Sequence, residues 1–412
     1  MVNVAIMGHG TVGSGVAEVL IKNADHIAEK AKSEIKIKYI LDLRDFENLS
    51  YSDKFTKDFN VILNDPEVLV VAELMGGLHP AFEFTKACLE SGKSVVTSNK
   101  ELVAAKGDEL LHIAEKHNVN YLFEASVGGG IPVLRPLAQC LAANEIYEVQ
   151  GILNGTTNFI MTKMVKEGFS FEDALAEAQR LGYAEKDPTA DIEGHDACRK
   201  ICILASLAFG KHVYPESVYT EGITKITSAD TAYADFAGYA IKLIGRAKRH
   251  DNDKCSVTVY PAFVSKNSLL TSVDDVFNAV MIKGDAVGDV VFYGRGAGKL
   301  PTASAVVADI IDCAKHLTAR KYLSWDCAVN GYVADHKEDN IRMYVRANFD
   351  GNRDNAKQSI EQLFGEVKIL GRNGESANEI AFITPFASEN TILSQLNKLS
   401  DFTLLATIRL LD

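Results

Sequence analysis

The chain has 412 residues, and because one domain usually takes ~100–200 residues, a single small module is excluded and two or three domains are expected. Hydrophobic residues make up 47% of the chain and charged residues 24%, a composition that excludes a disordered or fibrous protein. The net charge of −12 argues against a nucleic-acid partner, because a phosphate backbone requires a basic surface.

The sequence also argues against a membrane partner and an oxidising compartment. No apolar run approaches the ~20 residues that span a bilayer. The N-terminal stretch MVNVAIMGHG lacks the basic and apolar regions of a secretory signal. The seven cysteines are scattered and have no CxxC or Cys/His spacing typical of a metal site. These features predict a cytoplasmic protein with reduced thiols.

The first 133 residues alternate predicted strands and helices, a pattern typical of a parallel sheet with helices on both faces. The expected strands are Val2–Met7, Ile35–Leu43, Val68–Leu74, Ser94–Thr97 and Asn120–Phe123. Helices are expected after the first strand, up to about Ile27, and at Ala81–Ser91. We predict an α/β fold with a Rossmann-type doubly wound sheet over residues 1–133, completed by residues 300–330 through a helix at Thr302–Ala319.

After Pro132 the pattern changes, and an α+β catalytic domain that also serves dimerisation is predicted over residues 134–299. Its expected elements are a strand at Tyr147–Leu153, helices at Phe159–Glu167, Phe171–Arg180 and Asp196–Phe209, and strands within Asp251–Leu270 and Met281–Val291.

Residues 341–412 follow a polar, charged linker and predict a separate ferredoxin-like βαββαβ unit. Its expected elements are Ile341–Asn348, Ala356–Phe364, Glu366–Leu370, Glu379–Thr384, Ile392–Lys398 and Phe402–Leu411.

A glycine-rich loop, Gly8-x-Gly10-x-x-Gly13, directly follows the first strand and opens a helix. In this setting the glycines allow a tight turn and bring backbone N–H groups against a dinucleotide pyrophosphate. At the end of the second strand, Asp42 suits a ribose 2′-OH and Arg44 suits a 2′-phosphate. Both NAD and NADP therefore remain candidates, with Arg44 slightly favouring NADP.

Two further loops follow predicted strands. Lys100 comes after Ser94–Thr97, near the sheet edge where ligands bind, and is either a ligand contact or a solvated loop lysine. The segment Glu124–Pro132 (EASVGGGIP) either presents oxygens to a hard cation or forms a hinge between domains.

The stretch Gly182–Lys200 is the most informative. Asp196 and Lys200 are spaced i,i+4 and share a helix face, and Lys200 leads into an apolar run. A lysine at the edge of a buried helix is a candidate for proton transfer, and the nearby carboxylates suit an ammonium-bearing substrate. The alternative is a structural ion pair, with the acids complementing the helix dipole.

Two more segments precede predicted helices. Asn154–Asn158 offers hydroxyl and N–H groups to a substrate carboxylate, although helix capping alone would also explain it. The glycine-rich turn Gly294–Thr302 either closes over the cofactor or is a plain loop.

Together these motifs resemble the homoserine dehydrogenase family over about three-quarters of the chain. The matching segments, in the family's order, are GHGTVG at Gly8–Gly13, TSNK ending at Lys100, EASVGGGIP at Glu124–Pro132, ILNGTTNFI at Ile152–Ile160, LGYAEKDPTADIEGHDACRK at Leu181–Lys200 and GRGAGKLPTASAVVAD at Gly294–Asp309. The resemblance implies reversible reduction of L-aspartate 4-semialdehyde to L-homoserine with NADPH or NADH, which feeds threonine and methionine biosynthesis.

The resemblance also implies roles for individual residues. Of the implied catalytic residues, Lys200 would exchange the proton with the substrate oxygen, Lys100 would assist at the reacting end, and Asp196 would help to hold the substrate. The implied substrate-binding residues are Glu185, Asp191, Tyr183, Thr156 and Gly155. The implied cofactor-binding residues are Gly8, Gly10, Thr11, Val12, Gly13, Arg44, Lys100 and Gly298. A structural monovalent cation, sodium, would be held by Glu124 and the carbonyls of Val127, Gly129 and Ile131.

Residues 341–412 resemble an ACT domain, which in this family serves regulation or assembly. An ACT ligand loop usually reads Asp-x-Pro-Gly, whereas this chain reads Asp-Gly-Asn-Arg at residues 350–353, so binding of an effector such as threonine stays open. A homodimer or homotetramer is expected.

Two other functions remain as alternatives. A non-catalytic dinucleotide-sensing regulator would have no need for the segment from Glu185 to Lys200. Aspartate-semialdehyde dehydrogenase would require a cysteine nucleophile, for which Cys198 is the nearest candidate.

Overall fold

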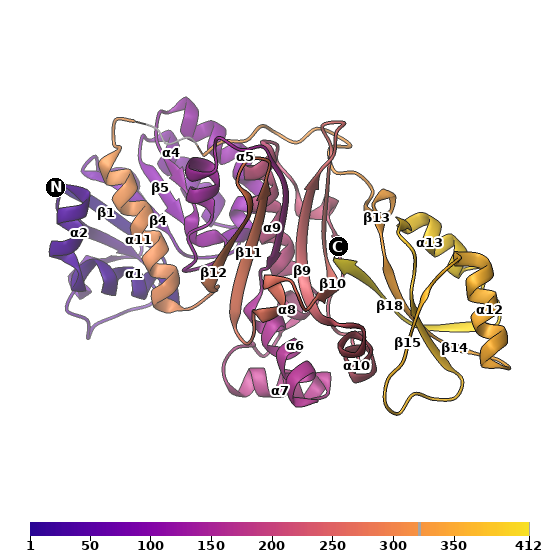
Figure 1. Ribbon diagram of the computed structural model, residues 1–412. Coiled ribbons are helices and arrows are strands. Elements are labelled where there is room, and N and C mark those ends of the chain that lie inside the picture. The colour runs from indigo at the N-terminus through magenta and orange to yellow at the C-terminus, as the bar shows by residue number, and fades with distance from the viewer. Residues whose placement is uncertain (320–322, 412) are drawn as a thin grey trace. The chain divides into compact units, whose positions relative to one another are not determined.

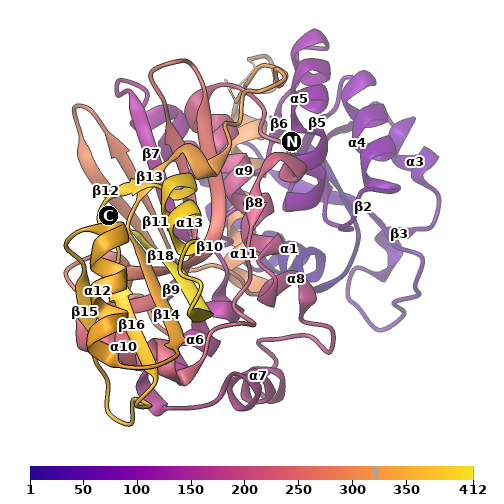
Figure 2. The same cartoon turned by 90° about the vertical axis from the view of Figure 1, so that its right-hand side faces the viewer.

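The computed structural model describes residues 1–319 and 323–411, and the chain divides into two compact units (Figures 1 and 2). Unit 1 contains Met1–Val149, Cys202–Pro215 and Ile282–Val329, and unit 2 contains Gln150–Ile201, Glu216–Met281 and Asn330–Asp412. Among the described residues, no helix combines the length and the apolar character needed to cross a membrane.

Unit 1 is built on a six-stranded sheet whose neighbouring strands are all parallel, in the order β3-β2-β1-β4-β5-β6. The strands are β1 (Val2–Met7), β2 (Ile35–Leu41), β3 (Phe55–Thr56), β4 (Val68–Glu73), β5 (Ser94–Thr97) and β6 (Tyr121–Leu122). The predicted Rossmann-type parallel sheet is confirmed. Because the strand order reverses between β1 and β4, a ligand is expected at the carboxyl ends of these two strands.

Helices cover both faces of this sheet, since alternate residues of β1 point to opposite sides and both sets are buried. The helices are α1 (Thr11–Lys22), α2 (Ala24–Ala31), α3 (Phe59–Leu63), α4 (Ala81–Glu90), α5 (Lys100–Lys116) and α11 (Lys299–Lys315). The predicted helix up to about Ile27 is interrupted at Asn23, and the whole of α5 was not predicted from the sequence.

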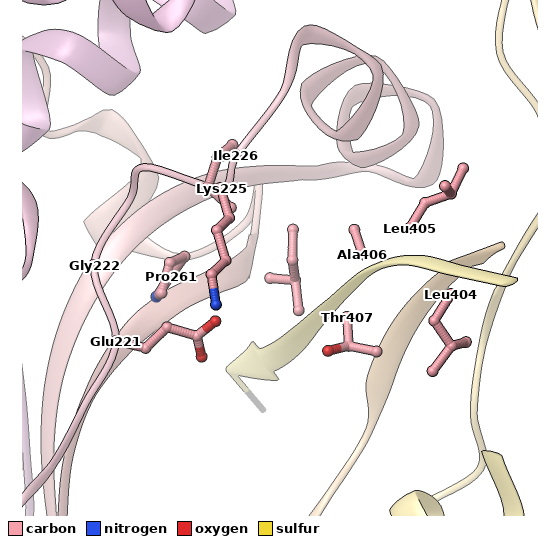
Figure 3. Close-up of a pocket in the computed structure, with 10 residues that line it drawn as sticks. Glu221, Gly222, Lys225, Ile226, Pro261, Leu404, Leu405, Ala406 and Thr407 are labelled. Atoms are coloured by element: carbon pink, nitrogen blue, oxygen red, sulfur yellow. The ribbon is translucent and has the colours of Figure 1, made fainter. Parts of the chain in front are cut away.

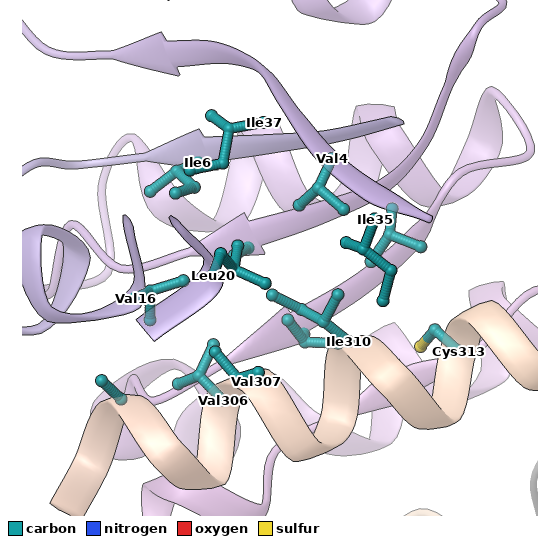
Figure 4. Close-up of a cluster of buried hydrophobic side chains, with 14 of the residues drawn as sticks. Val4, Ile6, Val16, Leu20, Ile35, Ile37, Val306, Val307, Ile310 and Cys313 are labelled. Atoms are coloured by element: carbon teal, nitrogen blue, oxygen red, sulfur yellow. The ribbon is translucent and has the colours of Figure 1, made fainter. Parts of the chain in front are cut away.

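Helix α11 comes late in the chain but packs into the core of unit 1 (Figure 4). Val306, Val307 and Ile310 lie against α1 and against the side chains that β1 and β2 direct to this face. Burying these aliphatic side chains contributes about 1.5–3 kcal/mol each. The glycine-rich turn before α11 is thereby held beside α1, where Lys299 forms an ion pair with Glu18 at 2.8 Å.

Unit 2 combines helices with mostly antiparallel strands. Its elements before the C-terminal segment are α6 (Gly155–Glu167), α7 (Phe171–Arg180), α8 (Thr189–Ile192), β8 (Tyr219–Thr220), α10 (Ser228–Ala237), β9 (Tyr239–Arg249) and β10 (Cys255–Ser265). Three elements contain residues of both units: β7 (Ile146–Ile152), α9 (His195–Phe209) and β11 (Phe277–Gly284). Strand β12 (Gly288–Arg295) belongs to unit 1.

The C-terminal segment of unit 2 forms a four-stranded antiparallel sheet in the order β18-β14-β16-β15. Its elements are β14 (Met343–Phe349), α12 (Arg353–Phe364), β15 (Lys368–Leu370), β16 (Glu379–Ile383), α13 (Glu389–Leu396) and β18 (Phe402–Leu411), with a short pair of β13 (Asn340–Ile341) and β17 (Ala387–Ser388). Apolar side chains of both helices pack on this sheet. Within the same unit, β18 also pairs with β10 in parallel.

Candidate active site

The glycine loop after β1 is shaped by two close backbone approaches. Gly8 has a φ of +95°, and an added Cβ at this position would lie 2.8 Å from the Leu74 carbonyl oxygen. A Cβ at Gly13 would lie 1.9 Å from the Gly8 carbonyl oxygen, whereas a Cβ at Gly10 would meet nothing within 4 Å. Gly10 is the N-cap of α1 and brings no side chain to it, so the free N–H groups of the first turn, which begins with Thr11 and Val12, are available to a phosphate.

Asp42 and Arg44, the two residues considered for cofactor recognition at the end of β2, are paired with each other. Arg44 donates hydrogen bonds to Asp42 from its backbone N, Nε and one terminal nitrogen at 2.9–3.0 Å. The His9 backbone N–H donates to Asp42 Oδ2 at 2.8 Å. The hydrogen bonds from Arg44 hold the pKa of the Asp42 carboxyl well below its usual range. Both oxygens of Asp42 are thus engaged, while 62% of the Arg44 side chain remains exposed.

Arg44 borders a cavity of about 400 Å³. Lys57 lines the same cavity and lies 2.8 Å from Asp45, and sequence reasoning did not identify it. Asp42, Asp45 and Glu47 line the cavity as well, so its two cations stand among three carboxylates. The position of Lys57 was not predicted from the sequence, because this residue follows the unpredicted short strand β3 and does not lie at the β2 end where the motif places cofactor contacts.

The turn before α11 and the triple-glycine segment meet within unit 1. Gly298, a predicted cofactor residue, has a φ of +126° and is the N-cap of α11. A Cβ at Gly129 would lie 2.5 Å from the Gly296 carbonyl oxygen, and one at Gly130 would lie 2.7 Å from Pro301. The packing therefore requires glycine at these positions and brings two separate glycine-rich motifs together.

Lys100 is the first residue of α5, directly at the carboxyl end of β5. Asn99 is the N-cap and accepts a hydrogen bond from the Leu102 N–H at 3.1 Å. A lysine in the first helical turn is unfavourable toward the helix dipole, so helix stability does not explain its presence. Its position at the sheet edge suits a contact with ligand.

Glu124 does not present a free carboxylate to a cation. Its two oxygens accept hydrogen bonds from the backbone N–H groups of Val133, Leu134 and Arg135 at 2.6–2.9 Å. Among the described residues, no group of three or more His, Cys, Asp and Glu side chains is arranged to hold a metal ion.

The predicted catalytic pair lies in unit 2, at the start of α9. Lys200 Nζ donates to Asp196 Oδ2 at 2.7 Å and to the Leu153 carbonyl oxygen at 2.8 Å. Both side chains are almost fully buried, with 10% of Lys200 and 6% of Asp196 exposed. The contact between Lys200 and Asp196 is the one that the i,i+4 spacing predicts. The Leu153 carbonyl, just after β7, is a second partner that this spacing does not predict.

Asn154 connects the Lys200–Asp196 pair to a second carboxylate, Asp191. The segment that begins at Asn154 was singled out from the sequence, but this residue was given no role of its own. Its Nδ2 donates to Asp196 Oδ2 at 2.8 Å and to Asp191 Oδ1 at 2.7 Å, while its Oδ1 accepts the Thr157 N–H and caps α6. The two carboxylates and Lys200 therefore share one hydrogen-bonded cluster. The sequence predicted that the NGTTN segment either binds a substrate carboxylate or caps α6, and the structure shows the capping.

The other predicted substrate residues also lie in unit 2. Gly155 begins α6, and Thr156 donates through Oγ1 to the Tyr183 carbonyl oxygen at 2.7 Å. The Tyr183 ring packs edge-on against Phe159. Glu185 lies in an exposed segment, and its carbonyl oxygen accepts from Gln179 at 3.1 Å.

A separate cavity of about 220 Å³ adjoins β18 and contains none of the predicted site residues (Figure 3). Glu221 and Lys225 point into it from the chain that follows β8. Pro261 lines the cavity, and the ladder between β10 and β18 begins at the next residue and involves residues 262–264 of β10.

Two family models match the chain. The model described as homoserine dehydrogenase matches residues 132–311, and the model described as homoserine dehydrogenase, NAD binding domain, matches residues 8–124. The chain is 46% identical over 320 residues to a homoserine dehydrogenase of Neisseria gonorrhoeae, covering 77% of this chain and 73% of that protein. It is 42% identical over 320 residues to that of Bacillus subtilis, with the same coverage.

Solved structures agree with these matches. A homoserine dehydrogenase from Thiobacillus denitrificans has a TM-score of 0.87 at 36% identity, covering 100% of this chain and 98% of that one. A hyperthermophilic archaeal homoserine dehydrogenase mutant in complex with NADPH has a TM-score of 0.65 at 29% identity, covering 76% of this chain and 97% of that one.

Proposed function

The chain belongs to the homoserine dehydrogenase family, and on this premise we propose that it reduces L-aspartate 4-semialdehyde to L-homoserine with NADPH or NADH, reversibly. The observation that carries the proposal is the buried Lys200 ammonium group, held between Asp196 and the Leu153 carbonyl. A buried lysine held in this way is suited to proton transfer at a substrate oxygen.

The residues of unit 2 supply the proton and stabilise the charge that develops on the substrate. When bound, the nicotinamide cofactor supplies the hydride. As negative charge grows on the carbonyl oxygen of the substrate, the Lys200 ammonium stabilises it electrostatically and donates a proton. In the reverse direction Lys200 accepts the proton from the hydroxyl group. Asp196 orients the ammonium group through its hydrogen bond with Nζ.

We propose that the surrounding acids hold the ammonium group of the substrate. Asp191 and Asp196 are oriented by the two N–H groups of Asn154, which prevents the carboxylates from turning away. Glu185 lies exposed in the segment before α8, and we propose that its carboxylate also contacts the substrate ammonium group. Thr156 and Gly155 offer the N-terminal end of α6 to the substrate carboxylate.

For unit 1 we propose that Gly8, Gly10 and Gly13 seat the cofactor pyrophosphate, with Gly298 closing the site beside α1 and Lys100 contacting the ribose or the reacting end. The carbonyls of Val127, Gly129 and Ile131, with the Glu124 backbone, would hold a monovalent cation such as sodium in a structural role. The Glu124 carboxylate fixes the shape of this loop through its three backbone N–H partners.

We propose NADPH as the preferred cofactor. Replacing Arg44 with alanine is expected to weaken NADPH binding by ~10–10²-fold, because a charge-assisted hydrogen bond to a phosphate contributes about 1.5–3 kcal/mol. NADH has no 2′-phosphate, so its affinity in the same variant is the internal control and should change little. The two dissociation constants, measured by nicotinamide fluorescence, check this, and equal weakening of both cofactors would contradict it.

The C-terminal segment from Ile341 has the βαββαβ order expected of an ACT-like regulatory unit. We propose that it serves assembly into a homodimer or homotetramer in the cytoplasm. The loop after β14 contains Gly351 but no proline, so threonine binding at that loop is not part of the proposal.

The experiment that tests the proposed reaction is oxidation of L-homoserine with NADP⁺, with the aldehyde product trapped by a hydrazine and identified by mass. Family membership predicts the trapped adduct. Aspartate-semialdehyde dehydrogenase would instead reduce NADP⁺ with aspartate 4-semialdehyde and phosphate and would lose activity with iodoacetamide. Cys198, the nearest candidate thiol for that chemistry, is buried with 4% exposed. A regulator would give neither product.

A further inference from the structure

A buried carboxylate outside the predicted site lies at the carboxyl end of the parallel sheet in unit 1. Glu73 is the last residue of β4 and is fully buried, with 0% of its surface exposed. In the sheet it stands between Met7 at the end of β1 and Thr97 at the end of β5. This is the edge of the sheet at which ligands bind in such folds.

The two oxygens of Glu73 accept hydrogen bonds from the turn after β4 and from the last residue of β5. Oε1 accepts the Met75 backbone N–H at 2.9 Å, which fixes the turn that leaves β4. Oε2 accepts the Thr97 hydroxyl at 2.7 Å, which sets the direction of that hydroxyl. Burial raises the pKa of Glu73, and these donors act in the opposite direction.

Thr97 passes this constraint to the start of α5. Because its hydroxyl hydrogen is given to Glu73, its oxygen accepts the Asn99 N–H at 2.9 Å. The Asn99 side chain then accepts the Leu102 N–H at 3.1 Å and donates to the Gly77 carbonyl oxygen at 2.7 Å. One carboxylate thus fixes both the chain after β4 and the first turn of α5.

We propose that Glu73 is a positioning residue, which holds the first turn of α5 so that Lys100 meets the ligand in one fixed place. This inference rests on the proposed function, because it assigns a purpose to the position of Lys100. Stability does not account for Glu73, since burying a carboxylate costs free energy that an apolar residue of similar size would avoid. The carboxylate fixes two loops at the edge of the sheet where ligands bind, and this role explains why a costly buried carboxylate is present.

The test compares Glu73→Gln with Thr97→Val, two variants of nearly unchanged size that break the same chain of hydrogen bonds. Because a small displacement of a positioning group can cost up to ~10²-fold in rate, each is expected to lower kcat for homoserine oxidation by ~10–10²-fold. The double variant should lose little more than either single one, and Thr97→Ser, which keeps the hydroxyl, should stay near the wild-type rate.

Asp108→Asn is the matched control, because it removes another buried carboxylate from unit 1, on α5 itself, where Asp108 accepts the Tyr214 hydroxyl at 2.9 Å. Its kcat should remain close to that of the wild type. A loss in Asp108→Asn equal to that in Glu73→Gln would show that the effect reflects general destabilisation and would overturn the proposal.

Amide hydrogen exchange tests, independently of catalytic turnover, whether Glu73 fixes the turn after β4 and the first turn of α5. The amides of Met75, Asn99 and Leu102 should exchange faster in Glu73→Gln and Thr97→Val than in the wild type and Asp108→Asn. Unchanged exchange at all three would overturn the role of Glu73. If the wild-type enzyme failed to oxidise homoserine while these amides behaved as expected, the proposed reaction would fall and the positioning of α5 by Glu73 would stand.

Discussion

Replacing Lys200 with methionine is expected to lower kcat in both directions by at least ~10²-fold, because the variant removes the general acid and base. The affinity for NADPH should change little, since Lys200 contacts Asp196 and the Leu153 carbonyl in unit 2. Methionine retains most of the volume of the side chain, which limits the loss of packing. Steady-state kinetics and cofactor fluorescence on the same preparation check both expectations.

Lys242→Met is the matched control for this prediction. Lys242 is another buried lysine of unit 2, with 4% exposed, and donates to the Val273 carbonyl oxygen at 2.6 Å. Removing it carries a comparable structural cost but leaves the predicted proton donor in place, so kcat should remain near the wild-type value. An unchanged kcat in Lys200→Met, or an equal loss in Lys242→Met, would contradict the role of Lys200.

The second large effect is expected at the glycine loop, where two alanine substitutions should fail for different reasons. In Gly13→Ala the new Cβ would lie 1.9 Å from the Gly8 carbonyl oxygen, so the turn must move. Overpacking of this severity is expected to lower the free energy of unfolding by about 3 kcal/mol or more. Thermal unfolding without ligand should show a markedly lower Tm.

In Gly10→Ala the added Cβ would meet nothing within 4 Å, so the stability of the chain should stay close to that of the wild type. The same open space is where the proposed pyrophosphate approaches the backbone, so NADPH affinity should fall by ~10-fold or more. Equal NADPH binding by Gly10→Ala and the wild type would show that the cofactor does not lie against this loop.

Much of the sheet in unit 1 was predictable because its strands are short apolar runs that end at glycine or polar residues. The predicted ranges of β1 and β5 coincide with the observed ones, as does that of β18 in unit 2. Helix α5 was missed, and its internal Gly107 is a residue that disfavours helix. The structure explains this glycine, because a Cβ there would lie 2.6 Å from the Trp325 ring.

The candidate site was predictable where it depends on local spacing. Asp196 and Lys200 are four residues apart on one helix, so their contact follows from helix geometry. The Leu153 carbonyl and Asn154 join them from another element, and a contact of that kind has no signature in local spacing. For Glu124 the residue types left a cation ligand and a hinge open, and the hydrogen bonds that three backbone N–H groups donate to its carboxylate have no signature in residue type.

The most direct test of the central claim is the loss of reduced-nicotinamide absorbance when purified protein is mixed with L-aspartate 4-semialdehyde, measured separately with NADPH and NADH. The account predicts substrate-dependent oxidation of the cofactor, L-homoserine as the product, and a faster rate with NADPH. Cofactor binding without turnover of either nicotinamide, or a rise in absorbance that requires phosphate, would contradict it.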